Sequence, residues 1–182
     1  MPTMNVDKMT FIHIPKTAGS AVTVWYIKNI LKKNPMYYEF PIVDDHIFIS
    51  EIENPAPITI SIVRNPWDRV VSMYSFLQQI NNMKFKKFSE FVLNDMKVLT
   101  FSKYLLSTPQ IRWIEPGVTH LLRFENLEQD FRIIQDIFQC YEPLPVWNKT
   151  NHYHYRMYYN DETRQAVAEM FKEDIEAFGY EF

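Results

Sequence analysis

The most constraining feature of the sequence is an apolar segment, PITISIV at residues 57–63, that leads into a helix-like segment. It is rich in β-branched residues and almost continuously apolar, which is typical of a strand covered on both faces. Arg64 ends this segment. Asn65 and Pro66 then have the residue types expected at the cap and the first position of a helix. The pattern predicts a buried strand followed by a helix, which is half of a βαβ unit.

The same pattern occurs twice more. MTFIHI, residues 9–14, is followed by the loop PKTAGS and a helix that Ser20 could cap. THLLRF, residues 119–124, precedes a segment with apolar residues at helical spacing, and a last helix is predicted over residues 161–178. We therefore expect an α/β fold with a parallel β-sheet flanked by helices, and ligands at the carboxyl ends of its strands.

Length and composition limit the organisation and the partners of the chain. Its 182 residues contain no repeat and only three glycines, so we expect a single domain over residues 1–182. A net charge of −3 gives no general reason to expect a nucleic-acid partner. The one cysteine, Cys140, excludes an internal disulfide and most metal frameworks. Without a membrane-length apolar run or a signal peptide, the sequence predicts a cytoplasmic protein.

The loop after the first predicted strand has the residues of an anion site. A loop that enters a helix offers backbone N–H groups and the positive end of the helix dipole. Gly19 allows close approach, Lys16 supplies a charge, and the hydroxyls of Thr17 and Ser20 can add hydrogen bonds. The alternative is a simple turn with a helix cap, because a Lys-Thr-x-Gly-Ser loop alone is weakly specific.

Arg64 makes the anion hypothesis more specific. In phosphate-loop nucleotide hydrolases an apolar strand often ends in an aspartate that helps to hold Mg²⁺, whereas here it ends in a cation. This favours a second anionic group, bound without metal by the planar guanidinium and by the hydroxyl of Ser72. The structural alternative pairs Arg64 with one of the 22 acidic residues. Asp68 and Arg69 are expected to form a capping charge and a structural ion pair.

Four segments together resemble a known family. FIHIPKTAGSA and IVRNPWDRVVSMY are similar to the two cofactor signatures of sulfotransferases that use 3′-phosphoadenosine 5′-phosphosulfate (PAPS). The likeness is greatest to Golgi-type carbohydrate sulfotransferases and their bacterial and viral relatives. It continues through LLRFENLEQDF and the segment from residue 148 to the end. The resemblance implies a sulfotransferase fold, which is similar to that of the phosphate-loop nucleotide hydrolases.

The resemblance also implies roles for particular residues. It assigns the 5′-phosphosulfate to the loop, with Lys16 near the oxygen that bridges phosphorus and sulfur. Arg64 and Ser72 match the pair that holds the 3′-phosphate. In NKTN, which resembles a segment that closes over the nucleotide, Lys149 and Thr150 are further candidate contacts. The candidate cofactor-binding residues are Lys16, Thr17, Ala18, Gly19, Ser20, Arg64, Ser72, Lys149 and Thr150.

The implied reaction moves a sulfuryl group to an acceptor hydroxyl by in-line attack, without a metal. The expected acceptor is a carbohydrate or another hydroxyl-bearing molecule, and the sequence does not indicate the oligomeric state. His46 is the candidate base, because related carbohydrate sulfotransferases carry a histidine upstream of the segment that IVRNP matches, and Asp44 or Asp45 could orient it. The alternative for His46 is a helix-capping or surface residue. For His13, at the end of the first strand, we expect a structural hydrogen bond.

Two other functions are compatible with the pattern. One is a nucleotide or small-molecule kinase of similar architecture, although a Lys before the Gly and a cation at position 64 speak against it. The other is a catalytically silent module that binds the nucleotide or serves in protein interactions. The first predicts a response to ATP with Mg²⁺, and the second predicts that Lys16 and His46 are dispensable.

Overall fold

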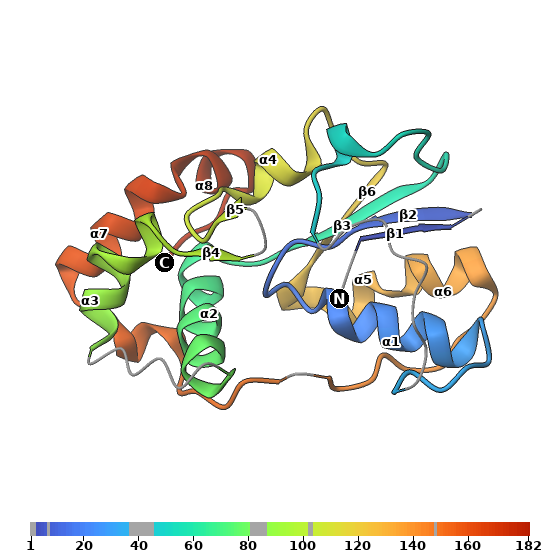
Figure 1. Ribbon diagram of the computed structural model, residues 1–182, viewed down its shortest axis with the longest axis horizontal. Coiled ribbons are helices and arrows are strands. Elements are labelled where there is room, and N and C mark those ends of the chain that lie inside the picture. Colours follow the sequence, from blue (N-terminus) through green and yellow to red (C-terminus); the bar gives the residue numbers. More distant parts are fainter. Residues whose placement is uncertain (1–2, 7, 37–45, 81–86, 102–103, 148) are drawn as a thin grey trace. The chain divides into compact units, whose positions relative to one another are not determined.

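The computed structural model divides the chain into two compact units, Met1–Val63 with Trp113–Lys149 and Arg64–Arg112 with Thr150–Phe182 (Figure 1). Both units are discontinuous in sequence, because the chain passes from one to the other three times. The structure describes residues 3–6, 8–36, 46–80, 87–101, 104–147 and 149–182. The predicted single domain over residues 1–182 is not tested by this division and stays a prediction.

The first unit contains a four-stranded sheet in the order β1, β2, β3, β6. Strands β2 (Met9–Ile12), β3 (Thr59–Val63) and β6 (His120–Arg123) run parallel, with Ile60 opposite His120. Strand β1 (Met4–Val6) is antiparallel to β2. The predicted parallel sheet is therefore wrong in this respect, and the sheet is mixed. Only two residues separate β1 from β2, a connection too short for the crossover that parallel strands need.

Helices follow the three parallel strands, as the alternation of patterns predicts. Helix α1 (Gly19–Asn29) follows β2, α2 (Pro66–Ile80) follows β3, and the turn η3 (Phe124–Asn126) with α5 (Leu127–Asp130) and α6 (Arg132–Phe138) follows β6. In Figure 1, α1, α5 and α6 lie on the same side of the sheet of their unit. The α/β class, with a sheet flanked by helices, is thus confirmed.

The core of the first unit joins this sheet to its helices. Phe11, Ile60 and Leu122 come from three neighbouring strands and are fully buried. From the helices, Trp25 and Phe131 meet edge to face, with ring centroids 5.1 Å apart. The indole N–H of Trp25 donates to the carbonyl of Glu142 at 2.7 Å, so its polar atom is satisfied within the core. This packing fixes α1 against the sheet and holds the loop that precedes the helix.

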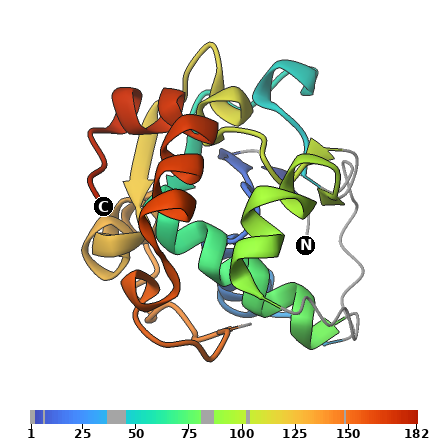
Figure 2. The same cartoon turned by 90° about the vertical axis from the view of Figure 1, so that its left-hand side faces the viewer.

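The second unit is mainly helical and is organised around α2. Asn65 caps this helix as predicted, since its side-chain oxygen accepts from the backbone N–H of Trp67 at 3.0 Å. Val70 and Leu77 of α2 pack in one core cluster with Phe91 of α3 (Phe88–Leu93) and Val167 of α7 (Asp161–Met170). Figure 2 shows α2 with the C-terminal helices, drawn in red, beside it.

The predicted helix over residues 161–178 is interrupted. Phe171, with φ −114° and ψ 29°, separates α7 from α8 (Lys172–Phe178). The apolar positions Val167, Phe171 and Phe178 are nevertheless all buried, as the spacing predicts. The remaining elements are η1 (Ile49–Glu51), η2 (Asp95–Lys97), the antiparallel pair β4 (Thr100–Phe101) and β5 (Tyr104–Leu105), α4 (Gln110–Ile114) and η4 (Tyr155–Tyr158). No helix within the described ranges is both long enough and apolar enough to cross a membrane.

Candidate functional site

The loop between β2 and α1 has an unusual backbone. Lys16 and Ala18 both lie in the left-handed region, with φ of 69° and 70°, which is uncommon for residues other than glycine. Thr17, between them, does not have a positive φ. Such alternation turns successive N–H groups toward one side and forms the concave backbone nests that bind anions. Strain of this kind often occurs at functional sites.

The start of α1 is capped by a residue without a polar side chain. Ala18 is the N-cap and makes no side-chain hydrogen bond, whereas Ser20, the residue that we expected as a cap, is the second residue of the helix. The hydroxyl of Thr17 is buried and donates to the carbonyl of Ile14 at 2.9 Å, so it holds the loop in shape. The first N–H groups of a helix have no acceptor within it and are suited to bind an anion.

Gly19 is required here by a neighbouring side chain. A Cβ atom built on Gly19 would overlap the imidazole ring of His13, which is buried just beyond the end of β2. The group that approaches this glycine in the structure is thus the His13 side chain, and the expected close approach of an anion to Gly19 stays a prediction. The contact of His13 with Gly19 joins the end of strand β2 to the first turn of helix α1.

Replacing Gly19 by alanine is expected to lower the free energy of unfolding by about 2 kcal/mol, within the range for overpacked cores. Urea unfolding of the parent and the variant measures this difference. Ser20→Ala, at the next helical position, is the control and should change stability by less than about 0.5 kcal/mol. In a His13→Ala background Gly19→Ala should lose most of its effect. An equal loss in both backgrounds would disprove the contact as its cause.

His46 packs against His13, the residue that contacts Gly19 where strand β2 leads into helix α1. The rings of His13 and His46 have centroids 4.5 Å apart at 42°, and both side chains are 4% exposed. The indole of Trp113 lies on His46 as well, with centroids 6.4 Å apart at 79°. The surface alternative for His46 is thus wrong, because the residue is buried. Asp44 and Asp45, the predicted orienting acids, lie outside the described residues.

Arg64, in the second unit, directly follows β3 and is 7% exposed. Its Nε and Nη2 atoms both contact Oδ2 of Asp68 at 2.8 Å, so the structural alternative of an ion pair with an acid is present. A guanidinium carries five N–H donors, and this pair therefore does not by itself exclude a second anion. Asp68 also lies in the first turn of α2, where its negative charge interacts favourably with the positive end of the helix dipole.

Ser72 and Thr150 are brought together within the second unit. Their hydroxyl oxygens are 3.4 Å apart and both residues are buried, although they are 78 positions apart in the chain. Lys149, the other candidate in the same sequence segment, is exposed. Two residues selected from separate motifs thus form one buried hydroxyl pair.

Arg69, on α2, is a second buried cation of this unit. It is 2% exposed, and burial lowers its pKa from 12.5 to about 10, while attraction from Asp174 opposes this shift and repulsion from Arg64 adds to it. Burial also raises the pKa of Asp174, against the effect of hydrogen bonds from Gln110 and the charge of Arg69. Asp174 is the acid that attracts Arg69, and the sequence pattern did not indicate it.

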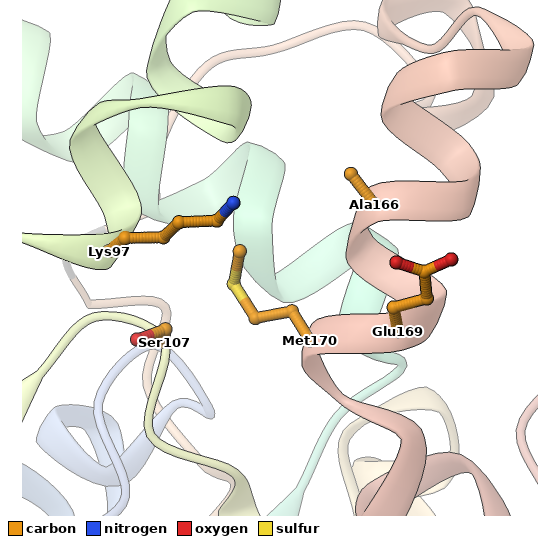
Figure 3. Close-up of a pocket in the computed structure, with 5 residues that line it drawn as sticks. All are labelled: Lys97, Ser107, Ala166, Glu169 and Met170. Carbon is orange, nitrogen blue, oxygen red and sulfur yellow. The ribbon is translucent and has the colours of Figure 1, made fainter.

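A separate pocket of about 400 Å³ lies in the second unit (Figure 3). Its lining residues are Lys97, Ser107, Ala166, Glu169 and Met170. None of these is a candidate from the sequence. Within the part of the chain that the structure describes, no three His, Cys, Asp or Glu side chains are grouped so that they could hold a metal ion.

Comparison with known proteins identifies no relative. No family model matches the sequence, and no curated protein or solved structure shows significant similarity to the chain.

Proposed function

We propose that the protein is a sulfotransferase that moves a sulfuryl group from PAPS to an acceptor hydroxyl, on a carbohydrate or a related molecule. The observation that carries the proposal is the loop before α1. It combines left-handed Lys16 and Ala18 with a helix start that has no side-chain cap. A helix start of this kind suits a phosphosulfate group.

Lys16 has a specific role in this proposal. As the bond between sulfur and the bridging oxygen breaks, negative charge accumulates on that oxygen, and a lysine beside it stabilises the transition state more than the ground state. Thr17 holds the loop through Ile14, and Gly19 lets the loop pack on His13. Lys16 is half-buried, so part of the residue is in contact with solvent.

In this proposal the 3′-phosphate of the nucleotide binds to Arg64 and to the hydroxyl pair of Ser72 and Thr150. A phosphate accepts hydrogen bonds from a guanidinium fork and from hydroxyl groups, and buried donors bind it more strongly than exposed ones. Arg64 replaces the acid that a magnesium-dependent nucleotide hydrolase often has at a strand end. Lys149 is exposed and adds at most a peripheral charge.

His46 is proposed as the base that accepts the proton of the acceptor hydroxyl. Its buried imidazole contacts the rings of His13 and Trp113, so its orientation is restricted before any acceptor binds. A group with restricted orientation needs less ordering in the transition state. This supports the catalytic interpretation of His46.

A thermal-shift measurement tests the proposal and separates it from a kinase. We expect adenosine 3′,5′-bisphosphate to raise the Tm without Mg²⁺. A ligand at 100 times its dissociation constant adds about 2.7 kcal/mol of stability. Stabilisation by ATP with Mg²⁺ alone would contradict the proposal and favour the kinase. If the bisphosphate binds but no labelled sulfate reaches any sugar, lipid or peptide acceptor, the silent binding module is favoured.

A further inference from the structure

The side chain of Gln110 clamps the backbone of Arg64. The N–H of Arg64 donates to Oε1 of Gln110 at 2.9 Å, and Nε2 of Gln110 donates to the carbonyl of Arg64 at 2.8 Å. Gln110, the first residue of α4, is fully buried. One amide group thus satisfies the donor and the acceptor of one residue, as a neighbouring strand would. The two bonds fix the peptide planes on both sides of the Arg64 Cα atom.

Asp174 fixes Gln110 in turn. Its Oδ2 atom accepts from the backbone N–H of Gln110 at 2.8 Å and from Nε2 of the same residue at 3.2 Å. Its Oδ1 atom accepts from the N–H of Ile111 at 2.9 Å. Asp174 lies on α8 and is fully buried. A buried carboxylate with three such bonds sets the direction of the Gln110 amide.

Three side chains therefore act together on the position and the direction of the Arg64 side chain. Gln110 sets the backbone, Asp174 sets Gln110, and Asp68 binds the guanidinium itself. Recognition of a phosphate by a guanidinium depends on the planar geometry of its fork. Small rotations at the Cα atom of Arg64 are enough to misalign that fork.

We propose that Gln110 and Asp174 are positioning residues of Arg64 that set the preference of the chain for a nucleotide with a 3′-phosphate. This inference rests on the proposed function. It goes beyond it by assigning the preference to an amide and a carboxylate that do not contact the nucleotide. A purely structural role of the two residues makes a different prediction, because it affects every nucleotide equally.

The test compares two ligands, adenosine 3′,5′-bisphosphate and adenosine 5′-monophosphate, by calorimetric titration. Gln110→Met keeps the volume of the side chain and removes both bonds to Arg64. We expect it to weaken bisphosphate binding about tenfold, because a misaligned guanidinium loses about one charge-assisted hydrogen bond to the 3′-phosphate. Binding of the monophosphate should change less than about twofold. Gln165→Met, at an exposed glutamine of α7, is the matched control and should change neither affinity.

A double-mutant cycle with Arg64→Met gives a sharper result. If Gln110 acts through Arg64, Gln110→Met should add little to the loss of bisphosphate affinity in the Arg64→Met background. Asp174→Asn, which keeps the shape of the side chain but loses its charge, provides a second variant if Gln110→Met does not fold. It should reduce the ratio of the two affinities in the same direction, by about threefold.

Each outcome decides between defined alternatives. If the folded variants bind both nucleotides more weakly by the same factor, the ratio of the two affinities is unchanged and the positioning role is overturned. A parent protein that shows no preference for the bisphosphate over the monophosphate overturns the proposed function as well. A parent with the preference and a variant without it supports both.

Discussion

Replacing Lys16 by alanine is expected to lower the rate of sulfate transfer ~100-fold or more. An electrostatic donor aimed at developing charge contributes on the order of 3 kcal/mol to the barrier. The backbone strain at φ 69° should change little, because lysine and alanine both carry a Cβ atom. The loss should appear in kcat rather than in the affinity for the donor PAPS, since the bridging oxygen becomes charged only during the reaction.

Lys28→Ala provides the matched control for this experiment. Lys28 is an exposed lysine in the last turn of α1, the helix that follows the Lys16 loop, so its removal changes the net charge equally. We expect it to leave the transfer rate within about twofold of the parent. If Lys28→Ala lowers the transfer rate as much as Lys16→Ala, the rate depends on the net positive charge near α1 and not on a lysine at the bridging oxygen.

The sequence predicts the parallel strands well and the rest of the sheet poorly. All five residues of β3 are buried, which is why its apolar run predicts a strand without ambiguity. Strand β1 has only three residues, MNV, and these contain no period from which a strand can be identified. Its antiparallel pairing with β2 follows from the short connection, and the prediction of a wholly parallel sheet fails for that reason.

One helix interruption is also hidden from the sequence pattern. Phe171, with φ −114° and ψ 29°, separates α7 from α8, whereas Phe131 between α5 and α6 keeps helical backbone angles. Phe171 is a buried core residue that continues the helical spacing, and the break contains neither the Pro nor the Gly that usually marks one. The spacing of apolar residues therefore gives no sign of this break.

The candidate site was predictable where it depends on local sequence. The loop at Lys16 and the cap at Asn65 follow from residue types within a few positions of a strand end. The clamp of Gln110 and Asp174 joins residues 46 and 64 positions apart through side chains and backbone, and such contacts leave no periodic signal. The contact between the tilted rings of His13 and His46 depends in the same way on tertiary structure.

Replacing His46 by asparagine is expected to lower kcat for sulfate transfer by roughly 100-fold or more, the usual effect of losing a general base. Asparagine is the informative substitution because the backbone of His46 has φ 49°, a conformation that asparagine tolerates better than most residues. It is polar but cannot accept a proton near neutral pH. The parent rate should fall toward acidic pH as the imidazole becomes protonated, and this acid limb should be absent from the variant.

His154→Asn is a suitable control for the loss of one imidazole, since His154 is exposed and is not a candidate base. It should leave both the rate and the acid limb of the pH profile unchanged. Binding of adenosine 3′,5′-bisphosphate to His46→Asn should remain within about twofold of the parent, because a base acts on the acceptor and not on the nucleotide. If His46→Asn retains the full rate and the acid limb, another group must accept the proton, and the role of His46 is then structural, as in its packing on His13 and Trp113.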